Sequence, residues 1–116
     1  DPDPLARSYA IRSYADVTRS QTCNRTFFSA LLEHETSSRC RLSCYYALSL
    51  FGDPSAIDHV LSYLSHEDYH VRCTAISILQ ELINTDNMTR IREALLERSK
   101  IEASSAVKGQ IAGFLP

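Results

Sequence analysis

Residues 52–79 read GDPSAIDHVLSYLSHEDYHVRCTAISIL, and this stretch predicts two helices joined by a short turn. In its first half, apolar residues recur at the i, i+3, i+4, i+7 spacing of a helix with one apolar face: Ile57, Val60, Leu61 and Leu64. Its second half, followed a little further, holds a similar stripe: Val71, Ala75, Ile78, Leu79 and Leu82. Asp53 is a suitable N-cap for the first helix, and Pro54 suits its first position. We therefore expect a helical hairpin here.

The start of the second helix recurs along the chain. The pattern Val71-Arg72-x-x-Ala75 has two close counterparts, Ala6-Arg7-x-x-Ala10 and Cys40-Arg41-x-x-Cys44, and a fainter one, Val107-Lys108-x-x-Ile111. Successive copies are separated by 34, 31 and 36 residues. Self-similarity at such a period indicates one supersecondary unit stacked on copies of itself.

Extending this interpretation to the whole chain predicts seven helices. They are expected over residues 4–18, 23–34, 38–51, 54–64, 68–83, 87–98 and 101–114. Asp3 and Asp68 are the expected caps of the first and fifth helices. In the first helix, Ala6, Ala10, Tyr14 and Val17 are expected to face inward. Short turns favour antiparallel pairs, in units of about 1–18, 22–51, 53–83 and 86–115 within one domain, 1–116.

The 52–79 segment closely resembles a HEAT repeat, and more narrowly the short HEAT-like unit of phycobilisome lyases. The opening DPDPLAR, residues 1–7, resembles the turn and second helix of the same unit. The resemblance covers essentially the whole chain and implies an all-α, right-handed α-solenoid of stacked antiparallel hairpins. It also implies that the recurring cations each reach an acidic group or a carbonyl of a neighbouring turn: Arg7, Arg41, Arg72 and Lys108.

Composition restricts the function classes. The 116 residues carry twelve Lys and Arg against fourteen Asp and Glu, a net charge of −2, which argues against generic phosphate binding. No apolar run approaches the ~20 residues that span a bilayer. The four cysteines are expected to be reduced packing residues of a cytoplasmic protein: Cys23, Cys40, Cys44 and Cys73. Because the chain opens inside a repeat, a fragment of a longer array is also expected.

Two patterns suggest metal chemistry, and neither is convincing. His34-Glu35 and His66-Glu67 are similar to the iron-binding dipeptides of deoxyhypusine hydroxylase, but in that family the dipeptide follows the Val-Arg position, whereas here it precedes it in a turn. Four zinc-ligand types lie near two helix starts, although two of them fall on the apolar stripe: Cys40, Cys44, His70 and Cys73. We therefore expect no catalytic, cofactor-binding or metal-binding residue, and no enzyme activity is predicted.

The leading hypothesis is a non-catalytic scaffold that binds another protein on the concave face lined by the second helices. The expected partner-binding residues are Arg12, Leu42, Tyr46, Ser77 and Gln80. An aromatic side chain beside an arginine is typical of an interface anchor, although Tyr46 could equally pack between helices. The alternatives are a lyase or chaperone-like subunit resembling phycobilin lyases, and a weak nucleic-acid binder. Self-association through uncapped ends is also considered.

Overall fold

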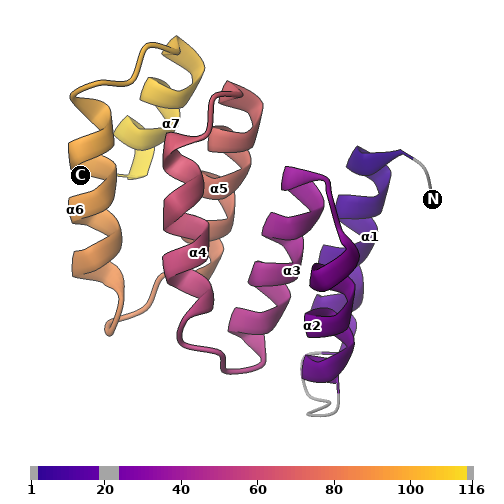
Figure 1. Cartoon of the computed structure of the whole chain (residues 1–116). Coiled ribbons are helices and arrows are strands. Elements are labelled where there is room, and N and C mark those ends of the chain that lie inside the picture. The colour runs from indigo at the N-terminus through magenta and orange to yellow at the C-terminus, as the bar shows by residue number, and fades with distance from the viewer. Residues whose placement is uncertain (1–2, 19–23, 115–116) are drawn as a thin grey trace. The chain divides into compact units, whose positions relative to one another are not determined.

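The computed structural model describes residues 3–18 and 24–114, and within them every regular element is helical (Figure 1). The elements are α1 (Pro4–Thr18), α2 (Asn24–His34), α3 (Ser38–Leu50), α4 (Ala56–Ser62), η1 (Tyr63–Ser65), α5 (Tyr69–Leu82), α6 (Met88–Ser99) and α7 (Ser105–Phe114). The all-α prediction is confirmed. No helix in the described ranges is both long enough and apolar enough to cross a membrane.

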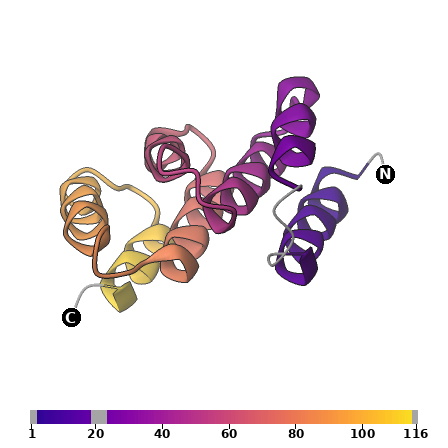
Figure 2. The same ribbon diagram turned by 90° about the horizontal axis from the view of Figure 1, so that it is seen from below.

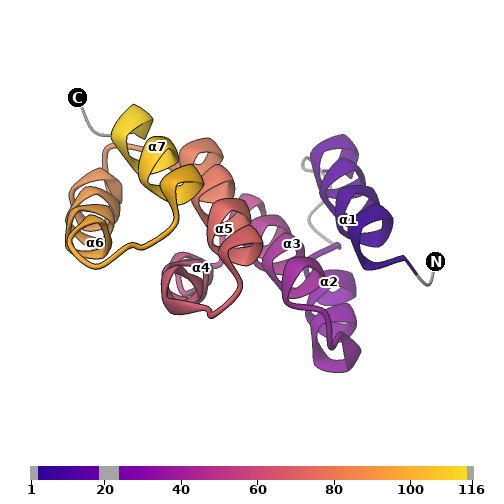
Figure 3. The same ribbon diagram turned by 90° about the horizontal axis from the view of Figure 1, so that it is seen from above.

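The chain divides into two compact units, Asp1–His59 and Val60–Pro116, with the boundary inside α4. In the first unit, α1 lies along α3, and α2 packs against α3 (Figure 2). In the second unit, α5 lies along α7 and also packs against η1, while α6 packs against α7 (Figure 3). Each unit therefore pairs two second helices of the repeat. In the first unit a first helix packs on α3, and in the second unit η1 packs on α5 and α6 packs on α7.

The two predicted apolar stripes are confirmed except at Leu61. Ile57, Val60 and Leu64 are buried, and so are all five predicted positions of α5, whereas Leu61 is half-buried. Gly52 follows Phe51, the C-cap of α3, and has a φ of +93°, a backbone conformation that favours glycine. The 54–64 helix begins later, at Ala56, because the Asp53 carboxylate accepts hydrogen bonds from the N–H and hydroxyl of Ser55 and holds that segment in a turn.

The predicted inner face of α1 is wrong. The buried residues are instead Ser8, Ile11, Ala15 and Thr18. Ala6 and Ala10 are exposed, and Tyr14 and Val17 are 45% and 79% exposed. The physical reason is that α1 packs on α3 through the opposite face. Ser8 marks that contact, because its hydroxyl lies 2.7 Å from the hydroxyl of Ser43.

Candidate functional site

The turn before α3 is organised around Glu35, a carboxylate that is almost fully buried. The Arg7 guanidinium donates to both of its oxygens, from Nε to Oε1 at 2.9 Å and from Nη2 to Oε2 at 2.8 Å. The backbone N–H of Ser37, the N-cap of α3, donates to Oε2 at 2.9 Å. The Arg7 hydrogen bonds and the Ser37 N–H outweigh burial and lower the pKa of Glu35 to about 2.

Glu102 has the same role in the turn before α7. Arg72 donates to it from Nε at 2.9 Å and from Nη2 at 2.7 Å, and Arg98 donates at 2.9 Å. The N–H of Ser104 donates at 2.9 Å, as Ser37 does to Glu35. Burial alone would raise the pKa of Glu102, but these four donors lower it to about 2. Because the Ser104 N–H is bonded to the Glu102 side chain, residues 101–104 form a turn, and α7 begins at Ser105 rather than near the predicted residue 101.

The turn before α5 carries a histidine where the other two turns carry a glutamate. His66 lies two residues before the N-cap Asp68, and its Nδ1 accepts the N–H of Asp68 at 3.0 Å. Arg72 Nη1 donates to the carbonyl of His66 at 2.8 Å, and Arg41 Nη1 donates to the carbonyl of Leu32 at 3.0 Å. Arg7 and Arg72 thus reach the carboxylate of the next turn, as the resemblance implies, and these two contacts join neighbouring repeats. The bonds from Arg41 and from Nη1 of Arg72 to backbone carbonyls lie within single hairpins.

The residues that suggested metal chemistry are engaged otherwise. Glu35 is bound by Arg7, and His66 binds the turn backbone. The Cys40 thiol donates to the Pro4 carbonyl at 3.2 Å, and burial raises the pKa of Cys44 to about 12. Across the part of the chain that the structure describes, no three His, Cys, Asp or Glu side chains are grouped to hold a metal ion. Cys23 lies outside the described residues.

The expected contact residues of the first unit form a small cluster between α1 and α3. The Arg12 guanidinium carbon lies 5.3 Å from the centre of the Tyr46 ring, and the Tyr46 hydroxyl donates to the carboxylate of Asp16. Tyr46 is only 4% exposed and Leu42 is fully buried. Neither offers contact area in this conformation. Tyr46 instead supports a half-buried Arg12 and an exposed Asp16 at the surface.

The expected contact residues of the second unit lie on α5. The Ser77 hydroxyl accepts a hydrogen bond from Gln110 Nε2 at 2.9 Å, and the same amide donates to the Cys73 carbonyl at 3.1 Å. Gln80 is exposed beside a shallow depression of about 280 Å³, whose lining includes Arg92 and Phe114. Ser77 is therefore fixed in the packing between α5 and α7, while Gln80 is free to contact a partner surface.

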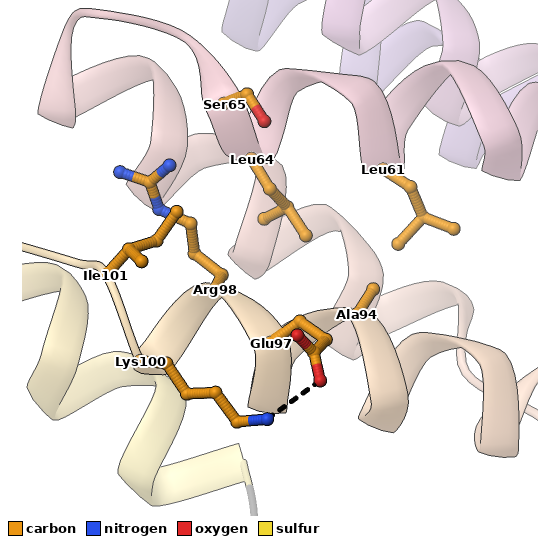
Figure 4. Close-up of a pocket in the computed structure, with 8 residues that line it drawn as sticks. All are labelled: Leu61, Leu64, Ser65, Ala94, Glu97, Arg98, Lys100 and Ile101. Atoms are coloured by element: carbon orange, nitrogen blue, oxygen red, sulfur yellow. Dashed lines mark hydrogen bonds and ion pairs between the residues drawn. The ribbon is translucent and has the colours of Figure 1, made fainter.

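A groove that the sequence did not predict runs between α6 and the α4–η1 segment (Figure 4). Its volume is about 380 Å³, and Leu61, Leu64 and Ala94 give it an apolar floor. Its rim carries the Lys100–Glu97 ion pair at 2.9 Å. Ile101, which follows the end of α6 and is exposed, also lines the groove. Apolar periodicity in the sequence does not show that this side of the hairpin is open.

A family model for HEAT repeats matches residues 26–112. A comparison with curated proteins and a comparison with solved structures each returned no match. The matched range takes in α3, α4, α5 and α6 in full, together with the turns built around Glu35 and Glu102.

Proposed function

Because this chain belongs to the HEAT-repeat family, we propose that it is a non-catalytic scaffold that binds another protein through its second helices. The contact residues are Arg12 in the first unit and Gln80 in the second, with Leu42, Tyr46 and Ser77 as the packed layer beneath them. In the stack that the resemblance implies, these helices line the concave side. Each unit offers a surface of its own.

The observation that carries the proposal is the cluster of Arg12, Tyr46 and Asp16. The buried Tyr46 side chain holds Arg12 over its ring and Asp16 through its hydroxyl. Because both charged side chains are already ordered, they lose little conformational entropy when a partner binds. An arginine stacked on an aromatic ring is enriched among residues that dominate interface energies. The cluster also presents opposite charges about one helical turn apart, which suits a partner with a complementary pair.

The remaining chemistry of the chain supports binding rather than catalysis. The buried carboxylates Glu35 and Glu102 are saturated by donors, and burial raises the pKa of the Cys44 and Cys73 thiols. Thiols kept protonated are poor nucleophiles and poor metal ligands. Free buried cysteines also suit the reducing conditions of the cytoplasm, where we place the protein.

The test is affinity capture from a lysate of the source organism with three variants. Arg12→Glu reverses the charge at the cluster, and Tyr46→Phe keeps the ring but removes the bond to Asp16. Arg25→Glu is the matched control, because Arg25 lies in the same unit on a first helix and is half exposed. Alanine at Tyr46 is avoided, because truncating a buried aromatic costs about 3–5 kcal/mol of stability.

We expect Arg12→Glu to lose one specific protein by at least tenfold, Tyr46→Phe to weaken its capture, and Arg25→Glu to retain it. An unchanged profile with folded Arg12→Glu would reject the α1–α3 surface. New visible absorbance on mixing with a bilin would favour the lyase-like alternative. Recovery of nucleic acid whose binding weakens steeply with salt would favour the second alternative, a weak nucleic-acid binder.

A further inference from the structure

The groove between α6 and the α4–η1 segment is lined only by residues of the second unit (Figure 4). One wall holds Leu61, Leu64 and Ser65, and the other runs from Ala94 in the middle of α6 to Ile101 just after its end. The two walls belong to first helices of successive repeats, and α7 follows them in the chain. The groove therefore lies within the repeat array, and neither end of the sequence leaves it open.

The floor of the groove is apolar surface that water reaches. Leu61 and Ala94 are half-buried, and Ile101 is 71% exposed. The wall from residue 94 to residue 101 is about 10 Å long at the rise of an α-helix. The volume of about 380 Å³ is small for a ligand pocket, since such pockets hold roughly 300–1,000 Å³. These dimensions fit one or two aliphatic side chains of a short segment.

The rim of the groove carries a surplus of positive charge. Glu97 and Lys100 form an ion pair at 2.9 Å and so neutralise each other. Arg98 pairs with the buried carboxylate of Glu102, but Arg72 pairs with the same carboxylate, so that two guanidinium groups face one acid. Among the described residues, Arg98 thus has no carboxylate of its own.

Arg98 also keeps hydrogen-bond donors that the fold does not use. Its Nε donates to Oε1 of Glu102 at 2.9 Å, whereas neither Nη atom donates to a group in the described ranges. Both Nη atoms reach solvent, because no buried side-chain nitrogen of those ranges lacks a partner. Figure 4 shows the Arg98 side chain passing Ile101 and leading away from the Glu97–Lys100 pair. Two donors therefore stand beside the apolar floor, available to an acceptor from outside.

We propose that this groove binds a short acidic segment of another protein, which places a Leu- or Ile-sized side chain on the floor and a neighbouring Asp or Glu carboxylate on Arg98. The two Nη atoms of a guanidinium present parallel N–H groups that match a carboxylate. A neutral or basic segment leaves the surplus charge uncompensated and binds more weakly. The site is separate from the second-helix surface proposed above, so either can fail without the other.

The test is an NMR titration that follows the backbone amide resonances of the ¹⁵N-labelled chain. The probe is the synthetic peptide GSLLDDSG, acetylated and amidated so that its aspartates are its only charges. The peptide GSLLNNSG keeps the shape and removes the charges, and GSSSDDSG keeps the charges and removes the apolar side chains. Comparing the three separates the contribution of the carboxylates from that of the floor.

Two pairs of variants locate the site. Arg98→Gln removes the cation, and Arg92→Gln is its control, an exposed arginine of α6 outside the groove lining. Ile101→Ser and Leu96→Ser form the second pair, because both side chains are exposed and only Ile101 lines the groove. This pair is independent of the bond that Arg98→Gln removes from Glu102. The dispersion of the amide resonances establishes that each variant is folded.

We expect GSLLDDSG to shift the resonances of residues 61–65 and 94–101 with a Kd on the order of 1 mM or below, and the other two peptides to bind at least fivefold more weakly. Arg98→Gln should abolish the advantage of GSLLDDSG over GSLLNNSG, and Ile101→Ser should weaken binding at least threefold. Both control variants should bind as the wild type does.

Three results would overturn the proposal. The first is the absence of any shift in those two segments at about 5 mM GSLLDDSG. The second is equal affinity of the wild type for GSLLDDSG and GSLLNNSG, which would exclude an acidic partner. The third is a set of shifts confined to other helices, which would exclude this groove as the binding site.

Discussion

Glu102 is buried yet ionised, because its carboxylate receives four hydrogen bonds from Arg72, Arg98 and Ser104. Replacing it with Gln leaves the nearly buried Arg72 guanidinium without its counter-charge. We expect Glu102→Gln to lower the free energy of unfolding by roughly 3 kcal/mol in urea denaturation. The control is Glu97→Gln, whose ion pair with Lys100 is largely exposed and is worth less than about 0.5 kcal/mol. Equal losses in the two variants would contradict this account.

The two turn glutamates also determine how stability depends on pH. Folding lowers their pKa values from 4.5 to about 2, so each binds fewer protons in the folded state than in the unfolded state. Their contribution is therefore complete above about pH 5 and is lost as pH falls toward 2. Urea midpoints measured from pH 7 to pH 2 should decline within that window. Glu35→Gln and Glu102→Gln should each flatten the decline, and a wild-type profile that is flat there would refute the ion-pair argument.

At the level of single residues, the sequence predicted the cations but not their partners. The resemblance indicated that Arg7 and Arg72 reach a neighbouring turn. Glu35 and Glu102 were not recognised as the acceptors, because a glutamate in a polar turn is unremarkable and burial is not visible in the sequence. One usable signal existed, namely a Glu placed two residues before a Ser N-cap in both turns. The sequence left open whether Tyr46 packs between helices, and it did not indicate that Leu42 is fully buried, because burial depends on the helices that surround α3.

Among the helices, α3 is the most enclosed, and its thiols should be inert. Cys40 and Cys44 have no exposed surface, and burial raises the pKa of Cys44 to about 12. We expect iodoacetamide at pH 8 to leave both unmodified in the native protein and to label both in urea. Peptide mass spectrometry reads the sites separately, and the partly exposed Cys73 is the internal comparison. Rapid native labelling of Cys44 would mean that α3 opens readily.

Helix ends and helix interiors give opposite predictions for the same substitution. Gly52 has a φ of +93°, which penalises any side chain, so Gly52→Ala should destabilise the protein by about 1 kcal/mol. Gly109 lies inside α7, where an added Cβ meets nothing within 4 Å, so Gly109→Ala should stabilise it by about 0.5–1 kcal/mol. Thermal melting of the two variants side by side measures both signs. Melting temperatures that shift in the same direction in both variants would contradict either the strained conformation of Gly52 or the open surroundings of Gly109.

The sequence predicted the elements well because apolar periodicity and caps are local. α2, α5 and α6 begin and end within one residue of the predicted limits. The start of α7 and the inner face of α1 were missed for a different reason. The first depends on Glu102 meeting Arg72 across 30 residues, and the second depends on which neighbours α1 has. Neither is encoded in the hydrophobic pattern of the segment itself.

For the molecule as a whole, charge argues against nucleic acid as a partner. The net charge is −2, and several of the twelve cations are committed to ion pairs or turn carbonyls. We expect fluorescence anisotropy with duplex DNA or single-stranded RNA to detect no binding below about 100 µM at physiological salt. Micromolar affinity that falls steeply between 50 and 200 mM salt would contradict this and restore the nucleic-acid alternative.

The hydrogen bonds that link neighbouring repeats all join residues separated by a similar length of chain. Arg7 and Glu35 are 28 residues apart, Ser8 and Ser43 are 35 apart, Arg72 and Glu102 are 30 apart, and Gln110 and Cys73 are 37 apart. Each of these bonds closes a loop of about one repeat, so the entropy lost on closure is similar at every step. During translation, a repeat can therefore lock onto its predecessor as soon as some forty further residues have left the ribosome, without waiting for the rest of the chain.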